Sequence, residues 1–146
     1  MKEIIGDLWY FHDKGYNIAI TTNGTIRGDG KNVMGKGCAK EAQDRYAWLP
    51  ELVGGWIKVG GNVPLYCGER IFTFPTKYHW SGSASPDLIM ASALEIKAMT
   101  EGSKCQIIIP RPGCGLGGLK WEEIGKLLAP VFDGDRFLII SRLEDE

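Results

Sequence analysis

Two glycine-rich segments of the chain have the residue types that bind phosphate groups. The first runs from Gly24 to Cys38, and the second runs from Gly113 to Gly118. Each segment follows an apolar, strand-like run and precedes a helix-like stretch. Glycine allows close approach and positive φ, and the free N–H groups at a helix N-terminus attract anions. Two such segments predict a cleft for a nucleotide or a diphosphate.

The first segment contains a stretch, Gly30 to Lys36, that matches the opening of a phosphate-binding P-loop. A P-loop needs Ser or Thr at the next position to place a hydroxyl on magnesium, and the sequence has Gly37 there. No apolar run ends in an Asp that would serve as the second magnesium ligand. These departures argue against a nucleoside triphosphatase.

The overall composition is that of an ordinary globular protein. The chain has 146 residues, of which 44% are hydrophobic and 24% charged, and its formal net charge is −1. We therefore expect a single domain over residues 1–146 and no general affinity for nucleic acid. The four cysteines show no metal-binding spacing, so we expect neither a zinc site nor any other cofactor.

The N-terminal residues do not resemble a signal peptide, and no apolar stretch of about eighteen residues is present. Reduced cysteines are the rule inside the cell. We expect a cytoplasmic monomer that does not bind membranes.

Strand-like and helix-like segments alternate along the chain. Strands are expected at 3–5, 17–22, 63–67, 70–75, 106–110 and 136–141, and helices at 38–46, 86–99 and 119–128. This alternation predicts an α/β fold whose mixed, mainly parallel sheet has helices on both faces. Ligands of such sheets bind outside the carboxyl ends of the strands.

Motifs at five places occur in the order and at the spacings that are typical of macro domains. They are Gly6-Asp7-Leu8, Asn23, Val33-Met34-Gly35-Lys36-Gly37, Phe74-Pro75-Thr76-Lys77 with Trp80 close by, and Pro112 to Trp121. The chain most resembles the branch of the DNA ADP-ribosyl glycohydrolase antitoxins and the terminal ADP-ribose glycohydrolases. The resemblance implies a three-layer α/β/α fold with about six strands and a cleft for ADP-ribose.

The resemblance also implies a role for the residues of the cleft. Asp7 would accept the exocyclic amine of adenine, Asn23 would contact the distal ribose, and the second glycine segment would bind the diphosphate. Some macro domains stack an aromatic ring on adenine where this chain has Arg142. The expected ligand-binding residues are Asp7, Leu8, Asn23, Val33, Met34, Gly35, Lys36, Gly37, Cys38, Thr76, Gly113, Cys114, Gly115, Leu116, Gly117, Gly118 and Arg142. Structural interpretations stay open: a helix cap for Asp7 and a small turn residue for Cys114.

The catalytic positions of the glycohydrolase branch are replaced in this chain. That branch uses a lysine of the first long helix and an acidic residue of the diphosphate loop, and Gln43 and Gly117 occupy these positions here. Glutamine is neither a nucleophile nor a base. The remaining catalytic candidates are Asn23, Lys40 and His79, although Lys40 and His79 also fit ordinary surface positions.

Two functions therefore stay open. The first is hydrolysis of an ADP-ribosyl derivative, such as ADP-ribosylated nucleic acid or protein, O-acetyl-ADP-ribose or ADP-ribose 1″-phosphate. The second is non-catalytic binding, as a reader or a sink for ADP-ribose. A third hypothesis, binding of single-stranded nucleic acid through the aromatic residues 74–80, agrees poorly with the near-neutral charge.

Overall fold

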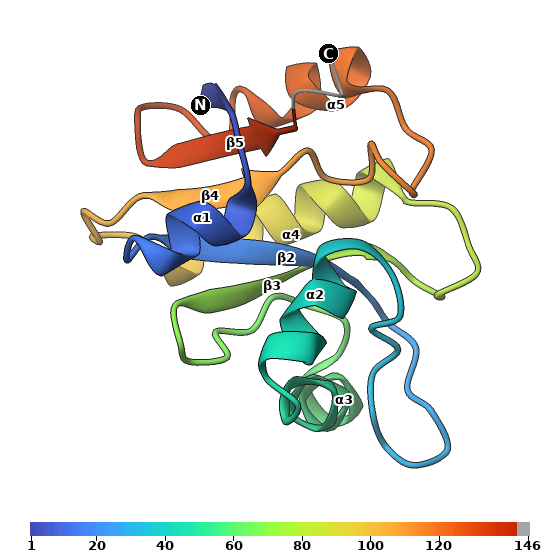
Figure 1. Ribbon diagram of the computed structural model, residues 1–146. Helices are drawn as coiled ribbons and strands as arrows, with labels where there is room; N and C mark the ends of the chain where they lie inside the picture. Colours follow the sequence, from blue (N-terminus) through green and yellow to red (C-terminus); the bar gives the residue numbers. More distant parts are fainter. Residues whose placement is uncertain (143–146) are drawn as a thin grey trace.

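The computed structural model describes residues 1–142, and a five-stranded sheet forms its centre (Figure 1). The strands lie in the order β1-β5-β4-β2-β3, and all their pairings are parallel. They are β1 (Lys2–Ile5), β2 (Asn17–Asn23), β3 (Ile71–Lys77), β4 (Ile107–Pro110) and β5 (Phe137–Ser141). Because every strand runs in the same direction, all five carboxyl ends lie at one edge of the sheet.

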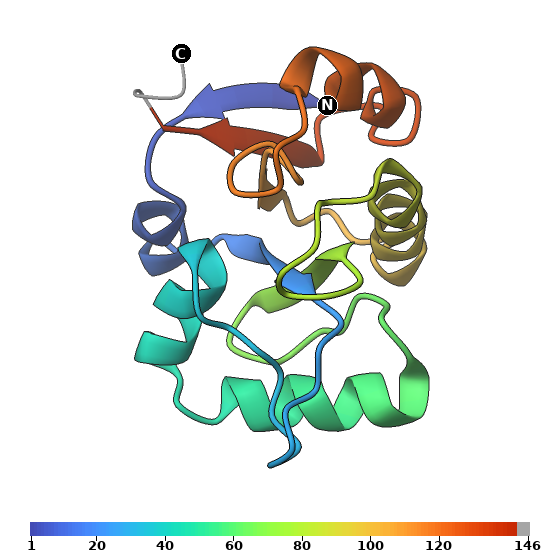
Figure 2. The same cartoon turned by 90° about the vertical axis from the view of Figure 1, so that its right-hand side faces the viewer.

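Five helices connect these strands and cover both faces of the sheet (Figure 2). They are α1 (Leu8–Asp13), α2 (Gly37–Arg45), α3 (Leu49–Gly60), α4 (Pro86–Met99) and α5 (Trp121–Leu128). Helices α1, α2 and α3 contribute to one hydrophobic core, and α4 and α5 contribute to the other. The three-layer α/β/α prediction is confirmed.

The alternation of side chains along the strands produces these two cores. In β2, Ile18 and Ile20 belong to the core of α1 to α3, while Ala19 between them belongs to the core of α4 and α5. In β4, Ile108 lies in the first core and Ile107 in the second. Strands that are buried on both faces need continuous apolar runs, which explains why these segments are recognisable in the sequence.

Side-chain caps fix the starts of two helices. Asp7 precedes α1 and accepts a hydrogen bond from the backbone N–H of Trp9 at 3.2 Å. Ser85 precedes α4 and accepts from the N–H of Leu88 at 3.3 Å, and Pro86 follows it at the first helical position. Both patterns are preferred helix starts. The cap at Asp7 places Leu8 at the carboxyl end of β1, where the candidate site begins.

The predicted strand at 63–67 is the main difference between the sequence prediction and the structure. This segment forms an isolated antiparallel bridge between Tyr66 and Phe72, and the N–H of Leu65 donates to the Thr73 hydroxyl at 2.9 Å. Pro64 has no N–H to donate and interrupts regular pairing. The described sheet therefore has five strands rather than about six, and it is wholly parallel.

Helices α1 and α3 were not predicted. Helix α1 has only 6 residues, and α3 contains Gly54 and Gly55 in its interior. Glycine disfavours a helix, but burial of Leu49 and Val53 in the first core stabilises α3. Within residues 1–142, no helix is both long enough and apolar enough to cross a membrane.

Candidate functional site

A cavity of about 970 Å³ opens along the carboxyl edge of the sheet. Residues at or just beyond the ends of all five strands line it, for example Gly6, Asn23, Lys77, Pro110 and Arg142. The segments that lead into α2 and α5 lie on the side of the molecule to which the β5 arrow points (Figure 1). The position agrees with the general rule that open parallel sheets bind ligands at this edge.

The first glycine segment brings the N-terminus of α2 to the cavity. Gly37, the first residue of α2, has φ +60°, which favours glycine. Lys36 precedes the helix and makes no side-chain cap. A Cβ added to Gly35 would meet no atom within 4 Å, so this residue faces open space. The first N–H groups of α2 are therefore available to an anionic ligand.

Two asparagine side chains hold this segment in place. The Asn23 amide nitrogen donates to the Val33 carbonyl at 2.8 Å, and its oxygen accepts from the Thr25 N–H at 3.0 Å. The Asn32 amide nitrogen, which is buried, donates to the carbonyls of Asn23 at 3.0 Å and Thr25 at 2.9 Å. Most of the hydrogen-bonding capacity of Asn23 thus fixes the loop. One N–H of its amide is left for a ligand hydroxyl.

The second glycine segment is held by close packing. Gly113 has φ +72°, and a Cβ there would lie 2.8 Å from the Ile89 side chain and 2.9 Å from the Ala84 Cβ. A Cβ on Gly117 would lie 2.5 Å from the Gly113 carbonyl oxygen. Gly115 differs, because its added Cβ would meet nothing within 4 Å.

Backbone N–H groups of the second segment are free to bind an anion. Among residues 1–142, the N–H groups of Gly115, Leu116 and Gly117 donate to no protein acceptor. Helix α5 begins at Trp121, three residues after Gly118, and Lys120 makes no side-chain cap at its start. The segment therefore presents both unpaired donors and a helix N-terminus to the cavity.

Charged side chains give the cavity an excess of positive charge. The basic residues that line it are Lys36, Lys77, Arg111, Lys120 and Arg142, and the acidic ones within the described chain are Glu41 and Glu122. Since the net charge of the whole chain is −1, this excess is local. A locally positive cavity attracts anions and concentrates them at the site.

Ion pairs orient two of these basic residues. Arg142 lies 3.4 Å from the Glu41 carboxylate, which connects the end of β5 to α2. Arg111 lies 3.8 Å from Glu3 and 5.5 Å from the centre of the Trp121 ring, whose N–H also donates to Glu3 at 2.7 Å. Both ends of the second glycine segment are thereby attached to β1.

The two cysteines of the cavity are neutral thiols. Burial raises the pKa of the Cys38 thiol, although hydrogen bonds from Thr21 oppose this effect. Burial also raises the pKa of Cys114 to about 11, and the nearby Arg111 only partly offsets the shift. A neutral thiol is a poor nucleophile. Both residues fill space in the wall rather than supply a reactive thiolate.

Most of the residues expected to bind ligand line this one cavity. These are Leu8, Asn23, Val33, Met34, Gly35, Lys36, Gly37, Cys38, Thr76, Gly113, Cys114, Gly115, Leu116, Gly117 and Arg142. Asp7 and Gly118 lie just outside the lining, and the carboxylate of Asp7 caps α1.

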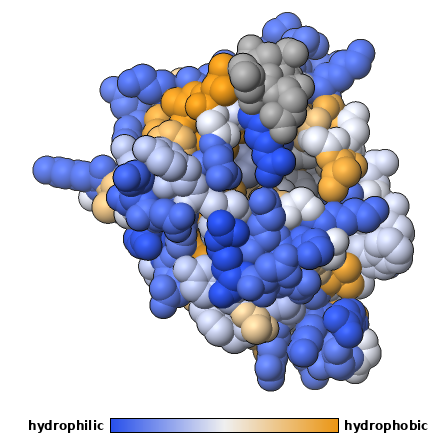
Figure 3. Space-filling view, in the orientation of Figure 1, coloured by the Kyte–Doolittle hydropathy of each residue, from blue (hydrophilic) through white to orange (hydrophobic). Residues whose placement is uncertain are grey.

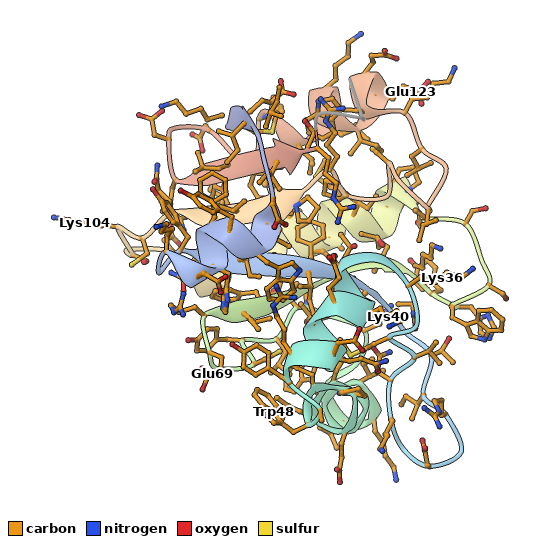
Figure 4. The ribbon with its side chains drawn as sticks, viewed as in Figure 1. Lys36, Lys40, Trp48, Glu69, Lys104 and Glu123 are labelled. Carbon is orange, nitrogen blue, oxygen red and sulfur yellow. The ribbon has the colours of Figure 1, made fainter. Side chains whose placement is uncertain are left out.

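Two of the three catalytic candidates, Lys40 and His79, lie outside the cavity. The Lys40 amine forms an ion pair with Asp44 at 2.8 Å on the exposed side of α2, and Figure 4 shows Lys36 and Lys40 at different positions around its start. The exposed His79 ring makes a 2.8 Å hydrogen bond with the Ser81 hydroxyl. Asn23 alone among the three candidates lines the cavity.

Several lining residues were not identified from the sequence. Glu41 is on the second turn of α2, Glu122 is on the first turn of α5, and Lys77 is the last residue of β3. A polar residue at the carboxyl end of a strand, or in the first two turns of the helix that follows, is the signal that could have identified them. This signal becomes visible only once the element boundaries are known.

Comparison with known proteins identifies relatives of this chain, although no protein-family model matches it. It is 30% identical over 111 residues to the DNA ADP-ribosyl glycohydrolase of Mycobacterium tuberculosis, which covers 68% of this chain and 32% of the relative. It is 29% identical over 103 residues to the protein of the same name from Thermus aquaticus, with coverages of 63% and 29%. The chain spans about a third of the length of these curated relatives.

Solved structures share the fold. The macrodomain of Thermus aquaticus DarG matches with a TM-score of 0.74 at 20% identity over 95% of both chains. The macrodomain of Mycobacterium tuberculosis DarG matches with a TM-score of 0.68 at 23% identity, over 94% of this chain and 97% of that one. Thermosipho africanus DarTG in complex with ADP-ribose gives 0.70 at 21% identity, over 99% and 43%.

The sequence matches and the shared fold point to the same family. The three-layer architecture agrees with the macrodomain structures, and the curated relatives found by sequence bear one name. The chain is therefore a macro domain of the branch that contains the DNA ADP-ribosyl glycohydrolases.

Proposed function

We propose that this chain binds ADP-ribose, or the ADP-ribosyl group of a larger molecule, in the cavity at the carboxyl edge of its sheet. The observation that carries the proposal is the convergence of two helix N-termini on one positively charged cavity. A diphosphate carries two negative charges and suits such a site. The ADP-ribose complex of a protein with the same fold supports this ligand.

The walls of the cavity suggest how the ligand lies. The diphosphate would occupy the centre, between Gly35 and the free N–H groups of Gly115 to Gly117. Adenine would lie beside Leu8 and Arg142, which line the cavity with an apolar side chain and a flat guanidinium. The distal ribose would lie near Asn23, whose amide retains one free N–H.

We further propose that the bound group is hydrolysed, with ADP-ribosylated nucleic acid as the first substrate to test. The bond between C1″ and the leaving atom would break, the oxygen of a water molecule would bond to C1″, and the proton of that water would pass to the leaving atom. Glu122 lines the cavity and is chemically suited to accept and relay this proton. The names of the curated relatives support this class of reaction.

A second function, binding without catalysis, is favoured by a separate observation. Gln43 and Gly117 replace the lysine and the acidic residue that the family resemblance assigns to catalysis. The Lys40 amine is engaged with Asp44 outside the cavity. A chain with an intact binding cavity and no turnover would act as a reader or a sink for ADP-ribose.

Calorimetric titration with ADP-ribose tests the binding site. We expect Gly115→Glu to weaken binding at least about 100-fold, because a carboxylate would enter the space of the diphosphate. Gly28→Glu is the matched control, since Gly28 is exposed, has open space around it and lies outside the cavity lining. Equal affinity of both variants would refute the proposed position of the diphosphate.

Incubation with an ADP-ribosylated oligonucleotide, followed by chromatography, separates the two functions. Release of ADP-ribose that is lost in Glu122→Gln, with ADP-ribose binding retained, would establish hydrolysis and identify Glu122 as the proton relay. Binding without release from nucleic acid, protein, acetyl or phosphate derivatives would establish the reader.

A further inference from the structure

Helix α3 carries an apolar stripe that is partly exposed to solvent. Trp48, which directly precedes the helix, is 43% exposed, Leu52 is 41% exposed, and Val59 is 83% exposed. Gly55 is also exposed, and a Cβ there would meet nothing within 4 Å. Figure 2 shows α3 along one edge of the molecule, and Figure 4 shows Trp48 at that edge.

This stripe lies on a helix whose inner side is also apolar. The opposite side of α3, with Leu49, Val53 and Gly54, is buried, so the helix is apolar on two sides. On the face shown in Figure 3, hydrophilic residues predominate and apolar ones lie in small separate areas. Several exposed apolar residues grouped on one helix face favour an interaction site.

The spacing along the stripe is that of a helix–helix seam. Trp48, Leu52, Gly55 and Val59 follow one another at intervals of four, three and four residues, which is the a/d pattern of a heptad. If a second helix packed against this seam in the opposite direction, Leu52 would meet Gly55, and Trp48 would meet Val59. In each of these two pairs, a larger side chain would then face a smaller one.

The charges beside the seam select an identical helix as the partner. Glu51 and Lys58 are both exposed and lie seven residues apart, so they occupy the same flank of α3. They are about 10 Å apart along the helix axis and do not pair with each other. In an antiparallel pair of identical helices, the same flanks meet, and each Glu51 would face Lys58 of the second copy. A parallel pair would not join these flanks.

We propose that two copies of this chain form a two-fold symmetric dimer through the exposed stripe of α3. The interface is closed, because each copy uses the same surface and none remains for a third. No residue of α3 lines the cavity among the described residues, so both cavities stay open. The stripe is short, and we expect a weak dimer with a Kd on the order of 100 μM. This inference does not depend on the ligand of the cavity.

Analytical ultracentrifugation from about 1 μM to about 1 mM tests the dimer. We expect the mean mass to rise from 16.1 kDa toward twice that value. Leu52→Glu should keep the chain monomeric over this range, because it places a charge in the seam. ADP-ribose affinity serves as the check that Leu52→Glu is folded. A monomer at every concentration, or assembly beyond two copies, would overturn the proposal.

Charge reversal distinguishes the antiparallel seam from any other contact. Glu51→Lys and Lys58→Glu should each weaken the dimer about fivefold or more, since each sets like charges against one another. The double variant, with both changes, should restore the affinity. Because both residues are exposed, none of the three variants should unfold the chain. A double variant as weak as the single ones would exclude this arrangement.

Discussion

The two glycine segments of the cavity reach the same edge of the sheet but are held there differently. The segment before α2 is fixed by side-chain amides, since Asn23 and Asn32 donate to the backbone carbonyls of Val33 and Thr25. The segment before α5 is fixed by packing, because Gly113 and Gly117 leave no space for a side chain. Hydrogen bonds from side-chain amides therefore fix the backbone before α2, whereas close packing requires glycine in the segment before α5.

Within each segment, one glycine both lines the cavity and has no atom within 4 Å of an added Cβ. Gly35 and Gly115 face open space in the cavity, where a ligand can approach the backbone. Gly113 and Gly117 are required by their neighbours in the protein itself. The comparison separates glycines that serve the fold from glycines that serve the ligand, and substitutions can test that separation.

The largest effect should come from Gly117→Ala. The new Cβ would lie 2.5 Å from the Gly113 carbonyl oxygen, so the loop must move. We expect a loss of about 3 kcal/mol in unfolding free energy and a fall in Tm of about 8 °C. Gly115→Ala in the same loop is the control, and its stability should change by less than about 1 kcal/mol. Equal losses in the two variants would contradict the division of roles.

A smaller effect is expected from Asn32→Ala in the other segment. This change removes the donor to the Asn23 and Thr25 carbonyls at a buried position. It should lower the free energy of unfolding by about 2 kcal/mol. ADP-ribose affinity should fall as well, because Val33 lines the cavity. Asn62→Ala removes a single hydrogen bond to the Lys77 carbonyl. It should lower the free energy of unfolding, measured by denaturant titration, by about half as much. A larger loss of stability in Asn62→Ala than in Asn32→Ala would show that Asn32 is not the residue that fixes the loop.

The thiol in the second segment should react slowly. A pKa of about 11 at Cys114, against the ordinary 9.0, lowers its thiolate fraction at pH 8 about 100-fold, and its alkylation rate should fall by about that factor. The exposed Cys105 is the internal control in mass-spectrometric mapping. The same shift makes the folded state less favourable as the pH rises from 9.0 through about 11, because the unfolded thiol ionises first. Faster labelling of Cys114 than of Cys105 would reveal an activated thiol.

The smallest effect should come from Lys40→Ala on α2. Its ion pair with Asp44 is exposed and contributes about 0.3–0.5 kcal/mol. ADP-ribose affinity and any turnover should stay within about twofold of the parent, because Lys40 does not line the cavity. A large loss of turnover would return Lys40 to the catalytic site.

Elements with one strong local signal could be predicted from the sequence. Helix α4 was predicted at its observed bounds, because Pro86 gives a preferred start and a broad apolar face follows. The continuous apolar runs at 17–22 and 106–110 identified β2 and β4. Helix α3 was missed because Gly54 and Gly55 disfavour a helix, and its stability comes from burial against segments distant in sequence.

The sequence by itself determined the alternation of strands and helices, the two glycine segments and the family resemblance, because these depend on residue types and their local order. Only the tertiary structure decided which polar groups share the cavity. It placed Glu41, Lys77 and Glu122 there and left Lys40 and His79 outside. The direction of a side chain depends on the register and packing of its element. That register is set by contacts between segments far apart in the chain, which no local pattern encodes.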